Sequence, residues 1–213
     1  MRPWLWYVWA PMVDRPEPEP LFHAELSRRN VRLGAIVVAV VIAGLGISLL
    51  RGPRSSGSPE ITGALRQSLE QNGCTVDSRT DKGQAHVPAA TYSVDPPSGG
   101  DHDPAPAKPG FYDMTNVPSD GHLVHSLEHG FVVIWYKSEP TGVPAATVDW
   151  LRELTRRHPW VIVAPRFPLP GAELAATAWH RRLLCPDGIL GIDEVITTFV
   201  NTFRDKGPER GFV

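Results

Sequence analysis

The stretch GHLVHSLEHGFVVIWY, residues 121–136, places three histidines and a glutamate directly before a run of apolar and aromatic residues. The second half of this stretch, residues 131–136, is rich in β-branched and aromatic side chains and predicts a buried strand. If residues 125–129 form one helical turn, the imidazoles of His125 and His129 share a face, with Glu128 beside them. A polar turn able to bind a metal ion would then be fixed at the rigid start of a core strand.

The rest of the carboxyl half shows clear hydrophobic periodicity. Two amphipathic helices are predicted, over residues 145–157 and 192–203. Two further strands are predicted over residues 160–164 and 174–179, and we expect Pro165 to end the first of them. The resulting order of strand, helix, strand, strand and helix predicts an α/β (α+β) sandwich with a small mixed sheet.

A single transmembrane helix is predicted before this domain. Residues 33–50, LGAIVVAVVIAGLGISLL, are 18 residues without a charge. At about 1.5 Å per residue they span about 27 Å, which is close to the thickness of the hydrocarbon core of a bilayer. Their flanks are proline-rich and charged, unlike those of a buried core helix. We therefore expect a single-pass protein of the cell membrane.

The span divides the chain into four parts. Residues 1–32 form a tail rich in tryptophan and proline, residues 33–50 the span, residues 51–59 a linker and residues 60–213 the main domain. Three arginines closely precede the span and two follow it, which favours a cytoplasmic tail and an extracytoplasmic main domain. Residues 60–72 are expected to form a helix at the start of that domain.

Both cysteines, Cys74 and Cys185, follow the predicted span. Two cysteines far apart in sequence, without a CxxC motif, indicate one long-range disulfide in an oxidising compartment. The alternative is a pair of buried free thiols. A disulfide would support an extracytoplasmic location for the domain.

The charge pattern argues against nucleic-acid binding. The formal net charge is −2, and the chain has no basic stripe and no RNA-reading aromatic motif. Arg181 and Arg182, which follow the third predicted strand, are expected to face solvent. The partners that we expect are the membrane itself and a membrane protein onto which the domain could dock.

A series of motifs follows in a fixed order along the domain. They are Cys74, His86, Tyr92 with DPPSGGDH, GFYD, VHSLEHGFVVIWY, TAW with Cys185, and KGPE. This series resembles a bacterial domain-of-unknown-function family, number three-one-zero-five, whose members usually follow one membrane span. The likeness covers roughly residues 73–209, although residues 98–100 are Ser-Gly-Gly where the family has a threonine-serine-glycine turn. The resemblance implies a membrane-anchored extracytoplasmic domain and no established reaction.

Four histidines at these motif positions are the candidate metal ligands: His86, His102, His125 and His129. Imidazole suits copper and zinc, which take three or four such ligands. Because its unperturbed pKa is about 6.5, an imidazole is mostly neutral and able to bind metal at physiological pH. Glu128 could complete the site, and Asp101 could ligate the metal or orient a histidine. The alternative is that these histidines hydrogen-bond to loops or lie on the surface.

We therefore expect the domain to bind copper or zinc. A second candidate function is a non-catalytic docking or structural module of a membrane complex. A third is a small metallohydrolase, because residues 125–129 match the H-x-x-E-H pattern of the inverted zinc peptidases. Those enzymes need a long helix around the motif, whereas here Gly130 and a strand follow at once. The sequence therefore favours a protein that is not an enzyme.

Overall fold

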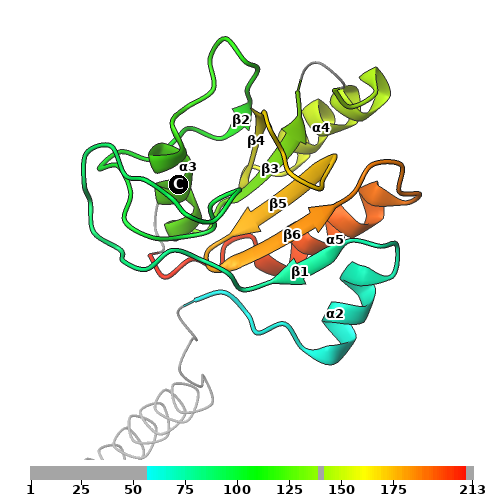
Figure 1. Ribbon diagram of the computed structural model, residues 1–213, viewed down its shortest axis with the longest axis horizontal. Helices are drawn as coiled ribbons and strands as arrows, with labels where there is room; N and C mark the ends of the chain where they lie inside the picture. The colour runs from blue at the N-terminus through cyan, green and yellow to red at the C-terminus, as the bar shows by residue number, and fades with distance from the viewer. Residues whose placement is uncertain (1–56, 139–141, 210–213) are drawn as a thin grey trace, which may run out of the picture. The chain divides into compact units, whose positions relative to one another are not determined.

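A six-stranded mixed sheet runs through the centre of the domain (Figure 1). The structure is a computed structural model that describes residues 57–138 and 142–209. Within these ranges the strands are β1 (Thr75–Asp77), β2 (Gly110–Phe111), β3 (Val132–Lys137), β4 (Val161–Arg166), β5 (Leu174–Ala178) and β6 (Arg181–Cys185). The helices are α2 (Gly63–Glu70), α3 (Asp120–Glu128), α4 (Ala145–Arg157) and α5 (Ile192–Phe203). The fold is therefore mixed α+β.

The predicted membrane span at residues 33–50 lies outside the described residues, as do the amino-terminal tail and most of the linker. None of the helices in the described ranges is both long and apolar enough to span a membrane. The described residues belong to one compact unit, Ser55–Val213, which contains two hydrophobic clusters.

Strand β3 lies inside the sheet, whose strand order is β1-β6-β5-β3-β4-β2. Its neighbour β4 is parallel to it and follows it through α4, whereas β5 on its other side is antiparallel. Beyond β5 the sheet continues with β6 and β1, both antiparallel to their neighbours, and β2 pairs in parallel with the outer edge of β4. The predicted mixed sheet is present, and β1, β2 and β6 enlarge it.

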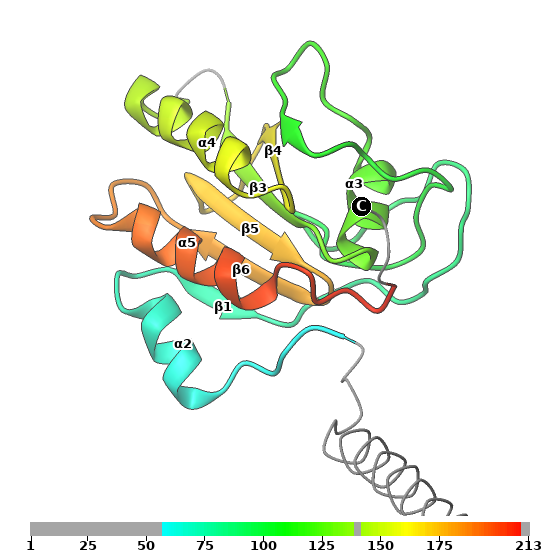
Figure 2. The same ribbon diagram turned by 180° about the vertical axis from the view of Figure 1, so that it is seen from behind.

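The two faces of β3 belong to two different cores. Val132 and Ile134 point into a cluster that also contains the apolar faces of α4 and α5, which Figure 2 shows together on one side of the sheet. Val133 and Trp135 point into the opposite cluster, together with Leu123, Val124 and Leu127 of α3. Because a strand alternates its side chains between faces, one run of apolar residues supplies both layers. Helix α3 is thereby held against one face of the sheet.

The predicted element bounds agree closely with the structure in the carboxyl half. Helices α4 and α5 begin and end where the periodicity places them, and the helix expected over residues 60–72 is the shorter α2. Pro165 does not end its strand, because it lies within β4 opposite Tyr136. β2 pairs only with Ile162 and Val163, so the outer edge of β4 is unpaired at Pro165 among the described residues. A strand edge tolerates a residue without an N–H group.

Arg182 corrects the expectation that both arginines after the third strand face solvent. It lies in β6, a strand that was not predicted from the sequence. Its exposed fraction is only 4%. Its guanidinium donates to the backbone oxygen of Asp95 and to the Asp77 carboxylate, each at 2.8 Å. Because a buried guanidinium is tolerated when it is paired, β6 can carry an arginine inside the domain.

Cys74 and Cys185 form the predicted disulfide. The bond joins the residue before β1 to the last residue of β6, across a sequence separation of 111 residues. Both half-cystines are buried, with exposed fractions of 2% and 0%. The bond therefore fastens the amino-terminal edge of the domain to its carboxyl-terminal hairpin.

Loss of this disulfide should lower the melting temperature of the protein. In the chain-entropy account, a bond that closes a loop of this length stabilises the fold by roughly 4–5 kcal/mol, which corresponds to a shift of about 10 °C for a domain of this size. Thermal unfolding followed by circular dichroism, with and without dithiothreitol, measures the shift. A Cys74→Ala/Cys185→Ala variant should melt like the reduced wild-type protein. Identical curves for oxidised and reduced wild-type protein would contradict the stabilising role.

Candidate metal centre

Helix α3 presents the central part of the site. Its amino end is capped by Ser119, whose hydroxyl accepts from the His122 N–H at 3.4 Å and donates to the Asp103 carboxylate at 2.7 Å. A Cβ at Gly121 would lie 2.5 Å from the carboxyl carbon of Asp103, so a larger residue here would displace the Asp103 side chain. The cap and the glycine together fasten the loop around residue 103 onto the first turn of α3.

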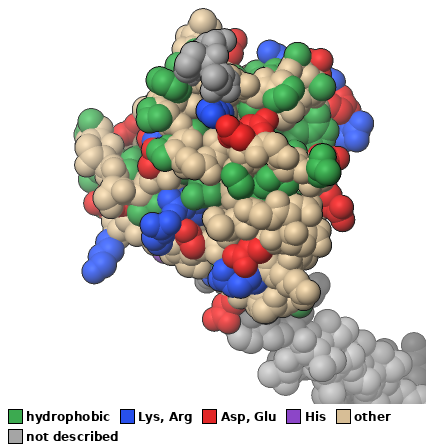
Figure 3. Space-filling model, turned by 45° about the vertical axis from the view of Figure 1, so that its right-hand side comes forward, with side chains coloured by type: hydrophobic (Ala, Val, Ile, Leu, Met, Phe, Trp, Pro, Cys, Tyr) green, Lys and Arg blue, Asp and Glu red, His purple; other side chains and the backbone are tan. Residues whose placement is uncertain are grey.

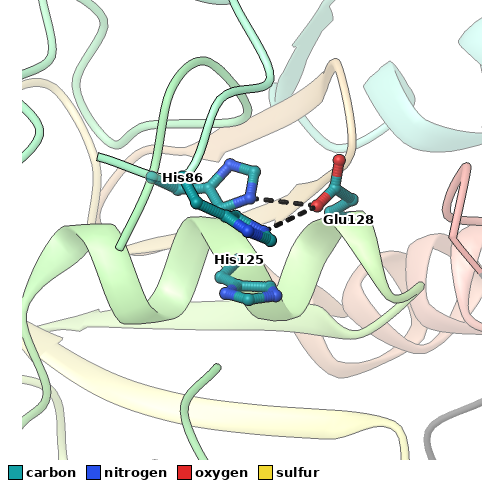
Figure 4. Close-up of side chains that lie close together, drawn as sticks. His86, His125 and Glu128 are labelled. Atoms are coloured by element: carbon teal, nitrogen blue, oxygen red, sulfur yellow. Dashed lines mark ion pairs between the residues drawn. The ribbon is translucent and has the colours of Figure 1, made fainter. Parts of the chain in front are cut away.

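Four side chains converge beside this helix: His86, His102, His125 and Glu128. Each offers one ligand atom, and these atoms all lie within 4.8 Å of one another. His125 and Glu128 are three residues apart on α3 and therefore share a face of it. Figure 4 shows these two side chains and His86 turned toward one another. The other two histidines come from the long loop between β1 and β2, so the site joins segments that are distant in sequence.

A short backbone bridge holds the two loop histidines side by side. The N–H of Val87 donates to the backbone oxygen of His102 at 2.8 Å, and the N–H of His102 donates to that of Ala85 at 3.0 Å. The Asp101 carboxylate accepts from the Ala85 N–H at 2.9 Å. Because these are backbone contacts, the loop is ordered at this point despite its glycines and prolines. Asp101 orients the segment that carries His86 and is not one of the four converging residues.

Backbone carbonyls decide which ring nitrogen carries the proton in two of the histidines. Nδ1 of His102 lies 2.9 Å from the Gly100 oxygen, and Nδ1 of His125 lies 2.7 Å from the Asp103 oxygen. A carbonyl oxygen only accepts hydrogen bonds, so in both rings Nδ1 must be the donor. In the neutral rings Nε2 then has a free lone pair, which is the form in which imidazole binds a metal ion.

Glu128 places a carboxylate against these lone pairs. The side chain is 1% exposed, and its Oε2 lies 3.0 Å from Nε2 of His102 and 4.0 Å from Nε2 of His86. Neither carboxylate oxygen has a hydrogen bond from any described residue. A buried carboxylate that faces a lone pair is repelled, so the contact requires a proton or a metal ion between Oε2 and Nε2.

His125 is held in its neutral form. Burial, together with the neighbouring rings of His102, His129 and His86, lowers the pKa of its imidazole to about 4. The hydrogen bond to the Asp103 oxygen acts in the opposite direction but does not compensate. At neutral pH a metal ion therefore does not have to displace a proton from this ring.

His129 lies next to the four converging residues without being one of them. It is the residue after α3, and its Nε2 lies 2.9 Å from Nε2 of His125. A metal ion bound by His125 would compete with this hydrogen bond. The sequence placed His129 in the ligand set because residues four apart on a helical turn share a face, and the stacked rings of His125 and His129 confirm that alignment. Glu128 also brings its carboxylate among the ligand atoms of His86, His102 and His125.

The carboxyl-terminal segment closes over the end of α3 and was not identified from the sequence. The N–H of Asp205 donates to the Gly130 oxygen at 2.8 Å, and the N–H of Glu209 donates to the Glu128 oxygen at 3.1 Å. Gly207 packs so closely that a Cβ there would collide with the Glu128 oxygen and the Gly130 nitrogen. The motif KGPE was the only sequence signal for this contact, because it contains Gly207.

Comparison with known proteins places the chain in a family. A family model described as "Protein of unknown function (DUF3105)" matches residues 86–213, more than half of the chain. No curated protein matches the chain, and no solved structure matches it. The match begins at His86 and includes all four converging residues.

A Gly207→Ala substitution should release the segment that closes over α3. The added methyl group meets backbone atoms that cannot rotate away, so we expect the free energy of unfolding to fall by about 1–3 kcal/mol. Hydrogen exchange at the amides of Asp205 and Glu209 should accelerate as well.

The matched control is Gly63→Ala, because a Cβ at Gly63 meets nothing within 4 Å and the residue lies in α2. That change should be neutral or stabilise the protein by up to about 1 kcal/mol. Equal stability of the Gly207→Ala variant and the wild-type protein would show that the segment does not clamp the helix.

Proposed function

The chain belongs to the DUF3105 family of proteins of unknown function, and we propose that its domain binds one transition-metal ion through His86, His102, His125 and Glu128. The observation that carries this proposal is the buried Glu128 carboxylate beside the Nε2 atom of His102, whose proton is held on Nδ1 by a backbone carbonyl. A divalent ion would satisfy that carboxylate and the histidine lone pairs together.

A proton explains this arrangement less completely than a metal ion does. Protonation of His102 would pair it with Glu128, but it would leave the His86 and His125 rings beside the pair with no role. The ring centroids of these three histidines lie 4.7–5.0 Å apart, so a second protonated ring would be repelled by the first. One metal ion uses all four side chains at once.

The donor set favours zinc or copper in the divalent state. Imidazole nitrogen suits both ions, and a carboxylate oxygen lowers the net charge of the bound ion. Cuprous copper prefers thiolate and thioether ligands. Both cysteines of the chain are joined in the disulfide, and no cysteine or methionine is among the four converging residues.

The membrane location remains part of the proposal. The uncharged segment at residues 33–50 supports a single membrane span, and the buried disulfide supports an extracytoplasmic domain, since such bonds persist in oxidising compartments. The domain would then expose its metal site outside the cytoplasm, as part of a single-pass protein of the cell membrane.

A docking module is the second candidate function, and one surface feature favours it. Met114 and Phe167 are about 60% exposed and border a cavity of about 320 Å³, which is also lined by Trp135 and Arg166. Exposed large apolar side chains around a hollow are typical of interaction sites. On the face shown in Figure 3, hydrophobic side chains lie between acidic and basic ones without a continuous basic field, which does not suit a nucleic-acid partner.

A metallohydrolase of the H-x-x-E-H type is not supported by the geometry. In such enzymes the two histidines of the motif hold the metal and the glutamate is the general base. Here the carboxylate of Glu128 lies among the converging ligand atoms. Glu128 is thus placed to hold a metal ion rather than to activate a water molecule.

Metal content is the direct test of the proposed function. The full-length chain, purified without a histidine tag, should contain about one equivalent of zinc or copper by mass spectrometry after reconstitution and desalting. The Glu128→Gln and His102→Ala variants should each lose most of that metal. At a free metal concentration of roughly 100 times the Kd, the metal should stabilise the wild-type protein by about 2.7 kcal/mol and raise its melting temperature. Either of these two substitutions should abolish that rise.

Two further histidine variants make the test specific. His129→Ala should retain the metal, although the sequence alone placed His129 in the ligand set. His122→Gln is the control for nonspecific uptake, since His122 lies on the same helix but hydrogen-bonds to the Ala105 oxygen at 2.6 Å instead. No metal in the reconstituted wild-type protein, or equal metal in the wild-type protein and Glu128→Gln, would contradict the proposal.

A further inference from the structure

The four converging residues differ sharply in how firmly they are held. His102, His125 and Glu128 are 0–3% exposed, whereas the side chain of His86 is 48% exposed. Two of the three buried residues lie on α3, and His102 is fixed through its Nδ1 to the Gly100 oxygen. No described residue forms a hydrogen bond with the His86 ring. His86 therefore has the fewest restraints of the four.

The contacts that do hold the His86 ring are weak and reversible. The ring stacks on His125 with centroids 4.7 Å apart and meets His102 edge-on at 5.0 Å. Its Nε2 is 4.0 Å from the Glu128 carboxylate, compared with 3.0 Å for His102. Stacking contacts of this kind contribute about 1 kcal/mol, and exposed side chains change rotamer within nanoseconds.

The backbone on either side of His86 is nevertheless anchored. The N–H of Val87 donates to His102, and the N–H of Ala85 donates to Asp101. The ring can therefore turn outward about its own side-chain torsions while the loop stays in place. Such a movement would open the site to solvent on one side without unfolding any element.

We propose that His86 is the exchange ligand of this site, the ligand that detaches when the metal ion enters or leaves. The ion would pass between the site and a metal-carrying molecule outside the domain. This role of His86 rests on the proposed metal binding, and it specifies the side from which the ion enters and leaves the site. The metal-carrying molecule would occupy the coordination position that His86 vacates. Its own ligand would be an imidazole, a thiolate or a carboxylate of a chelator or protein. During release, His102, His125 and Glu128 would hold the ion until the other molecule has bound it. The site would thus transfer its metal ion to other molecules, and the ion would not serve only to stabilise the fold.

Release kinetics test this inference. The full-length chain loaded with one equivalent of Zn²⁺ is mixed with rising concentrations of the chromophoric chelator 4-(2-pyridylazo)resorcinol in a stopped-flow instrument. In the wild-type protein the release rate should rise with chelator and then saturate, because detachment of His86 becomes limiting. The His86→Ala variant should still bind about one equivalent, release it at least roughly tenfold faster, and show no saturation over the same range.

The controls separate this inference from the proposed function. His122→Gln changes an exposed histidine outside the cluster and should release zinc at the wild-type rate. Unchanged melting of the metal-free His86→Ala variant shows that the fold survives, as expected when the bridging hydrogen bonds use only backbone atoms. Equal release rates in the wild-type protein and His86→Ala, or complete loss of zinc from His86→Ala, would overturn the exchange role. A wild-type chain that binds no zinc or copper would overturn the proposed function itself.

Discussion

A carboxylate buried against histidine lone pairs is the constraint on which this domain depends. Glu128 is 1% exposed and receives no hydrogen bond from the described residues, yet its Oε2 lies 3.0 Å from a histidine nitrogen. Burial of an unpaired carboxylate costs several kcal/mol, so a proton or a metal ion must compensate for it at this point. The rest of the structure can be understood as the support that fixes this group and its three imidazole neighbours.

That support comes from both ends of the domain. The loop between β1 and β2 brings His86 and His102 to α3 through backbone hydrogen bonds, and the cap at Ser119 fastens the same loop to the helix. The carboxyl-terminal segment closes over the end of the helix, where Gly207 touches the backbone of Glu128. The disulfide joins β1, from which the loop departs, to β6. Three buried residues are thereby preorganised, while His86 keeps an exposed ring.

Local sequence patterns predicted the regular elements of the carboxyl half well, because their periodicity reflects burial against one sheet. They failed where a tertiary contact overrides the local signal. β6 begins with two arginines, and Arg182 is buried only because Asp77 and Asp95 receive it. Pro165 continues a strand because the edge beside it is open. In the site, helical spacing correctly placed the rings of His125 and His129 together, whereas it could not predict the backbone contacts that bring the loop of His86 and His102 to α3. Long-range contacts of this kind produce no hydrophobic periodicity that a single sequence would show.

X-ray absorption spectroscopy of the zinc-loaded protein tests the central claim most directly, because it reports the atoms that surround the ion. The structure predicts a first shell of nitrogen and oxygen only, at about 2.0–2.1 Å, with imidazole scattering from three rings and no sulfur. Glu128→Gln should bind zinc weakly, so it is measured with excess zinc, and its shell should lack the carboxylate oxygen. A shell dominated by water oxygens, or one that is unchanged in Glu128→Gln, would show that these four residues do not form the metal site.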